Sequence, residues 1–275
     1  MERLFASLVE LLELEELDRD LYRARNEVAG TRRNLFGGQV AAQALKAAGM
    51  TVPPDRHPHS FHGYFLRNGS PERPIILHVA RDRDGGTYSA RRVSAVQGGE
   101  VIFSMAASFQ AERDGAEFGV PMAEGVPGPE DCPPYRFRES FPLIEAAEFP
   151  PPPRDVPFQT PSRYWMRFRE PLGDDPAVHG CALAYISDIG SGYSSLDLPN
   201  TPLGGPSLSH SLWYHASVRA DDWVLLDMWP LMVGASRGLY TGAIHARSSG
   251  RLACMLTQEN LLSGFGRDDR VPAGA

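Results

Sequence analysis

Three polar residues stand beside or inside apolar runs in the C-terminal half of the sequence. Asp188 follows the apolar run 181–186, Ser207 follows a turn rich in glycine and proline, and Gln258 lies in the last apolar run. A carboxylate can accept a proton from water, while a hydroxyl and an amide fix the orientation of that water. Each residue also has an ordinary structural role available, as an N-cap aspartate, a turn serine and a solvent-facing glutamine. Residue chemistry alone therefore leaves a water-activating site and three structural residues as open alternatives.

The sequence also matches the pattern of a serine nucleophile motif. Residues 234–238 read Gly-Ala-Ser-Arg-Gly, which places Ser236 at the nucleophile position of G-x-S-x-G. A nucleophile elbow needs a strand before the serine and a helix after it. The segment 239–244 is instead typical of a strand entering a hairpin, so a serine hydrolase using Ser236 is the weaker alternative.

Three histidines cluster in the N-terminal half. His57, His59 and His62 have a spacing that suits neither one strand face nor a zinc-binding helix, and no carboxylates lie among them. We therefore expect no metal site. On a regular strand His57 and His59 share a face, which makes His59 the histidine able to face a cleft.

Composition narrows the class of protein. The chain has 275 residues, with 27 Lys and Arg against 34 Asp and Glu, and a net charge of −7. Binding to nucleic acid requires clustered basic residues, and none occur, so a nucleic-acid partner is not expected. Three widely spaced cysteines form no disulfide framework, and no run approaches the roughly 20 apolar residues of a membrane span. The acidic N-terminus shows no signal peptide, so we expect a cytoplasmic protein that acts on a small molecule.

Hydrophobic periodicity outlines the N-terminal half. An amphipathic helix is expected over residues 4–14, and small residues on all sides predict a fully wrapped helix over 40–48. Alternating runs then predict a four-stranded antiparallel meander over residues 60–66, 74–83, 87–97 and 101–110.

The second half repeats this order after a proline-rich segment. Twelve of the 24 prolines fall between Pro121 and Pro161, which argues against a helix or a central strand there. We therefore divide the chain into units 1–111 and 162–275, joined by a linker over 112–161. In the second unit 182–187 is interpreted as a strand, followed by four further strands. An offset of 148 residues aligns the halves and pairs His62 with His210, so the two units are expected to share one continuous sheet.

Several blocks together resemble one known family. They are residues 36–44 (FGGQVAAQA), 59–67 (HSFHGYFLR), 88–93 (YSARRV), 107–110 (ASFQ), 187–188 (SD), 207–215 (SLSHSLWYH) and 257–259 (TQE). In this order they are similar to the type II, TesB-like acyl-CoA thioesterases, from about Leu11 to Leu262. The proline-rich segment is not part of the resemblance.

The resemblance implies an α+β fold called a double hotdog, in which two helix-in-sheet units share one chain. It also implies hydrolysis of fatty acyl-CoA to free acid and coenzyme A, with no metal or other cofactor. The family's catalytic aspartate, serine or threonine, and glutamine carry over to Asp188, Ser207 and Gln258. The first histidine of the HSFH block carries over to His59. By the same resemblance we expect a homo-oligomer, a dimer or larger.

Residues that contact the substrate fall into two expected sets. Backbone N–H groups at helix starts and tight turns can polarise the thioester carbonyl, and basic residues at the rim can hold the phosphates of coenzyme A. The first set is Gly37, Gly38 and Gly190, and the second is Arg67, Arg91 and Arg92.

Three positions depart from the family pattern. Ser209, Asn260 and Ser263 stand where the family often has Asp, Gly and Arg. These changes leave the catalytic residue types intact and are expected to alter the width of the pocket. A non-catalytic acyl-CoA-binding module of the same fold remains an alternative.

Overall fold

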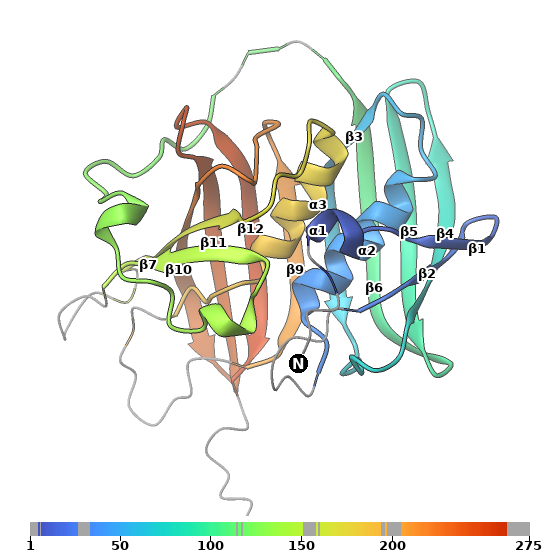
Figure 1. The fold of residues 1–275 in the computed structure, drawn as a ribbon, viewed down its shortest axis with the longest axis horizontal. Helices are drawn as coiled ribbons and strands as arrows, with labels where there is room; N and C mark the ends of the chain where they lie inside the picture. Colours follow the sequence, from blue (N-terminus) through green and yellow to red (C-terminus); the bar gives the residue numbers. More distant parts are fainter. Residues whose placement is uncertain are drawn as a thin grey trace, which may run out of the picture.

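One twelve-stranded antiparallel sheet curves around two helices (Figure 1). The computed structural model describes residues 5, 7–26, 34–113, 115–116, 118–150, 158, 160–193, 196 and 205–262. The strand order is β1-β2-β4-β5-β6-β3-β9-β12-β11-β10-β8-β7. The strands are β1 (Glu15–Asp18), β2 (Leu21–Ala24), β3 (Arg56–Phe65), β4 (Ile75–Asp84), β5 (Tyr88–Gln97), β6 (Glu100–Ala111), β7 (Ile144–Glu148), β8 (Ser162–Phe168), β9 (Ser207–Tyr214), β10 (Val224–Gly234), β11 (Arg237–Ala246) and β12 (Leu252–Leu261). The helices are α1 (Leu8–Leu11), α2 (Gly37–Gly49) and α3 (Pro176–Ile186), with short 3₁₀ turns η1 (Pro129–Asp131) and η2 (Arg138–Ser140).

Helices α2 and α3 pack against each other on the inner face of the sheet. The wrapped helix predicted over 40–48 is confirmed as α2, whose alanines are almost completely buried. The strand predicted over 182–187 is wrong, because these residues belong to α3. A short apolar run does not distinguish a buried strand from a buried helix. Here Asp175 caps the helix by accepting a hydrogen bond from Ala177 N, and Pro176 occupies the first turn.

The two halves join where β3 pairs with β9. Their antiparallel ladder runs from Ser60↔Trp213 to Tyr64↔Ser209 and is centred on His62↔Ser211. The expected continuous sheet is therefore confirmed. The simple meander is wrong, because β3 pairs with β6 rather than with β4 and so leaves its other edge for β9.

The predicted equivalence of His62 and His210 does not hold in the structure. His62 is exposed, whereas His210 has no exposed surface. A shift of one residue turns a side chain to the other face of a sheet. Because the ladder is centred on His62↔Ser211, the residue that corresponds to His210 is Phe61, which is also fully buried.

Two further segments, one at the N-terminus and one in the middle of the chain, differ from expectation. The first helix is limited to α1, and a hairpin of β1 and β2 follows it. The proline-rich segment is not linker throughout, because β7 lies in it and pairs with β8 at the edge of the sheet. Strand β7 falls in the gap between Pro142 and Pro150, where every residue has an N–H to donate.

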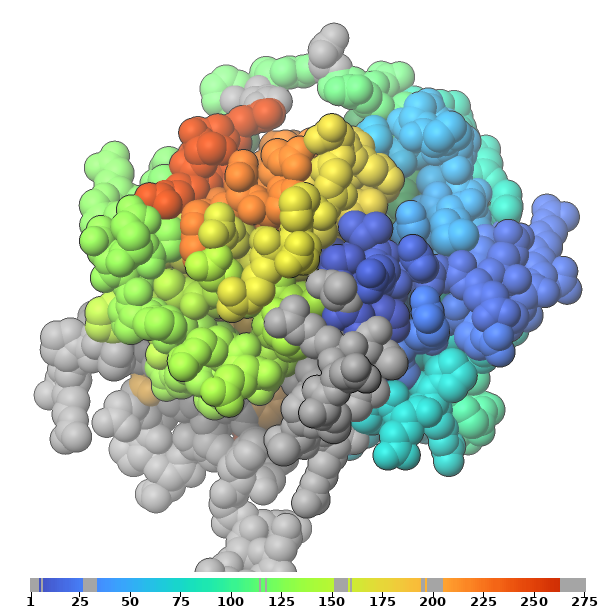
Figure 2. All heavy atoms as spheres, in the orientation of Figure 1, coloured from blue at the N-terminus to red at the C-terminus, as the bar shows by residue number. Residues whose placement is uncertain are grey.

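The inner face of the sheet is covered by chain from both halves. In the space-filling view the N-terminal residues (dark blue) lie beside α3 (yellow) on this face (Figure 2). Phe5, Leu8 and Leu11 are buried there in the main core. Among the described helices, none is long and apolar enough to cross a membrane.

Candidate active site

The structure brings Asp188, Ser207 and Gln258 together in one hydrogen-bonded cluster. The Ser207 hydroxyl donates to Asp188 Oδ1 at 3.0 Å, and Gln258 Nε2 donates to the same oxygen at 2.8 Å. Gln258 Nε2 also donates to Ser207 Oγ at 2.6 Å. A carboxylate only accepts hydrogen bonds, so the amide must present its nitrogen to Asp188.

Three elements of the C-terminal half position this cluster. Asp188 is the second residue after the end of α3, Ser207 begins β9, and Gln258 lies within β12 beside β9. A register shift between Glu259 and Asn260 sets Asn260 opposite Ser207. Such a bulge re-aims side chains, and here it turns Ser207 toward the same side as Gln258.

Asn260 is a member of the cluster that the sequence analysis missed. Its Nδ2 lies 3.4 Å from Ser207 Oγ and 3.4 Å from the carbonyl oxygen of Gly205. The sequence marked Asn260 only as a departure from the family pattern, and its opposition to Ser207 depends on the bulge. Ser263, another departure, lies outside the described residues.

Two members of the cluster, Asp188 and Ser207, form part of the wall of a cavity of about 920 Å³ between the two halves. Asp188 and Ser207 come from the C-terminal half, while the start of α2 and the end of β3 come from the N-terminal half. Most of the remaining wall is apolar, formed by Leu35, Phe36, Val40, Phe65, Leu66, Ile102, Phe103 and Leu208. The cavity can therefore hold an apolar chain next to a carboxylate.

Gly37 and Gly38 place the start of α2 directly beside Asp188. A Cβ atom on Gly37 would lie 2.6 Å from Asp188 Oδ2, and one on Gly38 would clash with the carbonyl oxygen of Tyr185. The residue at the N-cap of α2, Phe36, makes no side-chain capping hydrogen bond. The first N–H groups of a helix have no partner within the helix and carry its positive end. They are therefore suited to a developing negative charge at this wall.

Gly190, the third predicted glycine, is not among the residues that line this cavity. Its φ is +86°, and a Cβ atom there would lie 2.9 Å from the ring of Tyr164. Turn geometry and the tyrosine ring account for this glycine, and no contact with the cluster is needed to explain it.

The three predicted arginines have three different environments. Arg67 lines the cavity, donates to the carbonyl oxygen of Val101 at 2.8 Å and pairs with Glu100 at 2.9 Å. Arg92 is exposed and pairs with Asp82 away from the cavity. The side chain of Arg91 is completely buried, so the prediction that it lies at the rim is wrong. An arginine side chain buried in this way is held by protein acceptors and is not accessible to a phosphate.

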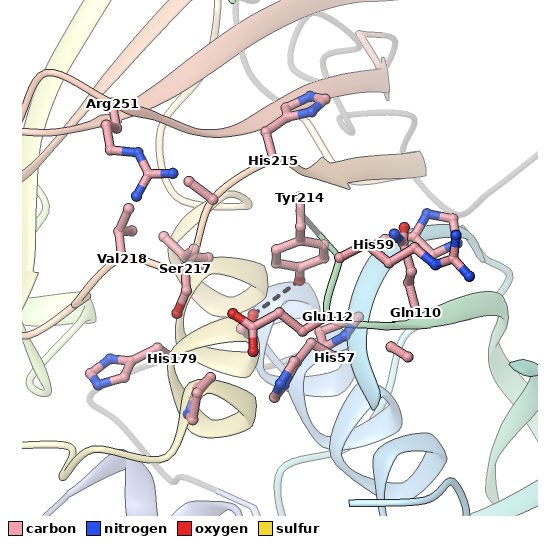
Figure 3. Close-up of a pocket in the computed structure, with 17 residues that line it drawn as sticks. His57, His59, Gln110, Glu112, His179, Tyr214, His215, Ser217, Val218 and Arg251 are labelled. Carbon is pink, nitrogen blue, oxygen red and sulfur yellow. Dashed lines mark hydrogen bonds between the residues drawn. The ribbon is translucent and has the colours of Figure 1, made fainter. Parts of the chain in front are cut away.

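His59 lies in a second cavity, of about 440 Å³ (Figure 3). His57 and His59 reach it from β3, and His179 reaches it from the N-terminal part of α3, whereas Asp188 follows the opposite end of that helix. His59 Nε2 is 2.7 Å from Ser108 Oγ, and burial lowers the pKa of the imidazole. The structure thus does not bring His59 to Asp188.

Ser236 occupies a hairpin turn. Ala235 and Ser236 have φ values of 49° and 58° and connect β10 to β11, which pair directly. Two successive residues with positive φ are typical of the two-residue turns that close hairpins. The hairpin prediction is confirmed, and no helix follows Ser236 as an elbow requires.

Comparison with known proteins identifies the family. The model for the acyl-CoA thioesterase N-terminal domain matches residues 27–110, and the model for the C-terminal domain matches residues 129–262. The chain belongs to the type II acyl-CoA thioesterase family.

Relatives of this thioesterase family cover nearly the whole chain. Acyl-coenzyme A thioesterase 8 of Rattus norvegicus is 37% identical over 92% of this chain and 87% of its own. Acyl-CoA thioesterase 2 of Haemophilus influenzae is 30% identical over 95% of this chain and 99% of its own. The crystal structure of an acyl-CoA thioesterase II from Mycobacterium marinum is 36% identical, with a TM-score of 0.79 over 92% of this chain and 96% of that one. The double hotdog fold expected from the sequence is thereby confirmed.

Proposed function

We propose that this protein hydrolyses fatty acyl-CoA with a water molecule activated by Asp188, Ser207 and Gln258. The observation that carries the proposal is the three-way hydrogen-bonded cluster at the wall of the apolar cavity. A carboxylate next to an apolar chain-sized space suits a water attack on the thioester at the end of an acyl chain.

Asp188 is the group that takes the proton from water. As the proton moves to the carboxylate, the water oxygen bonds to the thioester carbonyl carbon. The carbon–sulfur bond then breaks, and the leaving thiolate of coenzyme A takes up the proton from Asp188. Ser207 and Gln258 hold the carboxylate in one orientation through the shared Oδ1 and so direct the attack.

The start of α2 supports the negative charge that develops on the carbonyl oxygen. The N–H groups of its first turn lie beside Asp188. The space between the helix start and Asp188 is too small for a side chain, and Gly37 has none. Preformed donors of this kind stabilise an oxyanion more than they stabilise the ground-state carbonyl.

The apolar wall accommodates the acyl chain, and Arg67 at the same cavity is the basic residue available for a coenzyme A phosphate. The net charge of −7 does not oppose this, because a phosphate responds to local positive charge. We expect Arg67→Ala to raise KM for acyl-CoA with little change in kcat.

A thiol-release assay with short, medium and long acyl-CoA esters tests the proposal. We expect Asp188→Asn to keep the fold, checked by circular dichroism, and to lower kcat by about 1,000-fold, within the range for a lost general base. Near-normal turnover by this variant would contradict the assignment. Saturable acyl-CoA binding by the wild-type protein without any thiol release would instead indicate a non-catalytic binding module.

We also propose that the protein is cytoplasmic and forms a homo-oligomer. All three cysteines are free, as in a reducing compartment. Tyr64 and Trp213 are exposed on β3 and β9 in the middle of the sheet, where a second copy would cover them. Cell fractionation and light scattering test these two points, and a monomer in solution would contradict the second.

A further inference from the structure

Among the buried polar atoms at the catalytic cluster that have no hydrogen-bond partner, two belong to residues that are paired across neighbouring strands. They are Nδ1 of His210 and Oε1 of Gln258. The two residues are opposite each other in the β9–β12 ladder, and both are almost completely buried. An unpaired polar atom in such a place is costly, so two facing orphans call for an explanation.

The protonation of His210 is decided by its other neighbour, Ser187. His210 Nε2 is 2.8 Å from Ser187 Oγ, which is itself 3.0 Å from the carbonyl oxygen of Ala184. Burial lowers the pKa of His210 to about 4, and the smaller effect of Gln258 raises it. The imidazole is therefore neutral at neutral pH and carries one proton, on Nε2 or on Nδ1.

The two tautomers differ in what they leave unpaired. With the proton on Nε2, the Nδ1 lone pair faces Gln258 Oε1, and two acceptors are buried together. With the proton on Nδ1, the ring donates to Gln258 Oε1, and the Ser187 hydroxyl turns to donate to Nε2. Only the second tautomer satisfies both orphan atoms.

We propose that His210 is a positioning residue whose Nδ1–H donates to Gln258 Oε1 and so fixes the orientation of the amide. The proposal rests on the function proposed above for Gln258. With Oε1 held by His210, Nε2 must point to Asp188 and Ser207. A flipped amide would set its oxygen against the Asp188 carboxylate and undo the cluster.

The same chain of contacts links the cluster to the end of α3. Ser187 is the C-cap residue of α3 and immediately precedes Asp188. The contacts lead from Ser187 to His210 and on to Gln258, which donates to Asp188, the residue that follows Ser187 in the sequence. One imidazole thus holds both the helix end that carries the acid and the amide that orients it.

The tautomer can be observed directly in the wild-type protein. Long-range ¹H–¹⁵N correlation spectra of protein labelled at histidine distinguish Nδ1–H from Nε2–H, and the signal of His210 is the one lost in His210→Asn. We expect the Nδ1–H form at neutral pH. An Nε2–H form would overturn the proposal, and this result does not depend on whether Asp188 is catalytic.

Kinetics of a matched pair of variants test the positioning role. The Nδ2 of asparagine replaces the Nδ1–H donor, whereas leucine removes it, so His210→Leu is expected to lose about ten-fold in kcat at similar KM, the scale of one hydrogen bond. His210→Asn is expected to regain most of that loss. His62→Leu, on the exposed face, is the control and should leave kcat unchanged.

Equal losses in His210→Asn and His210→Leu would overturn the proposal, and so would full activity of His210→Leu. Should His210→Leu fail to fold, the tautomer measurement and the His210→Asn kinetics still decide the question. A catalytically active Asp188→Asn combined with the Nδ1–H tautomer would reject the proposed function and keep the hydrogen bond.

Discussion

The two halves of the molecule share one architecture, but the acid, hydroxyl and amide of the C-terminal half are replaced by other residue types at the corresponding described positions of the N-terminal half. Starting from the central pair His62↔Ser211, the ladders give the residue that corresponds to each member of the cluster. Phe61 corresponds to His210, Ala107 to Gln258 and Arg91 to Tyr240. The two halves have equivalent bulges, and Pro58 corresponds to Ser207. Asp188 corresponds to Thr51, the second residue after α2.

The N-terminal half uses the same place for a structural anchor. Arg91 donates to Thr51 Oγ1 at 2.8 Å, to the Thr51 carbonyl oxygen at 3.0 Å and to Asp84 at 2.6 Å. These bonds tie the end of α2 to β4 and β5. The two halves thus keep the same strands and helices, while corresponding positions serve the proposed reaction in the C-terminal half and stability in the N-terminal half.

The N-terminal ends of α2 and α3 also differ between the two halves. The start of α3, at the second cavity, is capped by the side chain of Asp175, while the start of α2 at the catalytic cluster has no side-chain cap. A side chain of the same helix therefore occupies the start of α3, whereas no capping side chain occupies the start of α2.

Among variants that test the difference between the halves, the largest expected effect comes from giving the C-terminal cluster a residue of the N-terminal half. Gln258→Ala gives the C-terminal half the residue that Ala107 already supplies in the other half. We expect kcat to fall by about 100-fold or more, since the amide orients both Asp188 and Ser207. Gln110→Ala, at the wall of the second cavity, should change kcat little in the same thiol-release assay. Comparable losses of kcat in both variants would contradict the proposed functional difference between the two halves.

The counterpart experiment removes the anchor. Arg91→Met removes the side-chain donor to the carbonyl oxygens of Thr51, Arg83 and Ala90, and we expect it to lower the free energy of unfolding by about 3 kcal/mol. Urea denaturation measures this, and kcat per folded molecule should stay near the wild-type value. A variant of normal stability but low kcat would show instead that Arg91 takes part in the reaction.

The buried histidine of the C-terminal row makes stability depend on pH, whereas Phe61 in the other row does not titrate. The folded pKa of His210, about 4, lies below its ordinary value of 6.5. The unfolded chain therefore binds a proton first, and stability is lost as pH falls from about 6.5 to 4, by roughly 3 kcal/mol at most. Denaturation of wild type and His210→Asn across this range measures the difference. An identical pH dependence in the variant would contradict the buried neutral imidazole.

The smallest effect concerns the start of α2. A methyl group at Gly37 would meet Asp188 Oδ2 and the ring of Phe65, so we expect Gly37→Ala to lower kcat by about ten-fold by moving the helix start away from the acid. Gly49→Ala at the other end of α2 meets its nearest atom at 3.8 Å and should have normal kcat. Equal activity of the two variants would show that the spacing between α2 and Asp188 is not critical.

Much of this arrangement was predictable from the sequence, for reasons that differ by residue. Alternation located β4, β5 and β6 within one or two residues, and the blocks around Asp188, Ser207 and Gln258 led to the family and to the three residues that the structure brings together. Alternation did not reveal the bulge between Pro58 and Ser60, which changes the direction of His59. The bulge depends on the pairing of β3 with β6, two strands that are far apart in the sequence.

Other errors have the same origin. Nothing local distinguishes Arg91 from Arg92, yet their side chains point to opposite faces of β5, one into the core and one to solvent. Asn260 joins the cluster only through its register with Ser207. The pairing of His210 with Gln258 likewise requires the neighbouring strands to be known.

The seam between β3 and β9 makes the reaction a property of the assembled chain. The cluster belongs to one half and the start of α2 to the other, so separating the halves would remove the proposed oxyanion donors without altering any proposed catalytic side chain. Turnover therefore reports on the integrity of the seam. Two separately expressed halves would each be inactive, and mixing them would restore hydrolysis only to the extent that they reassociate.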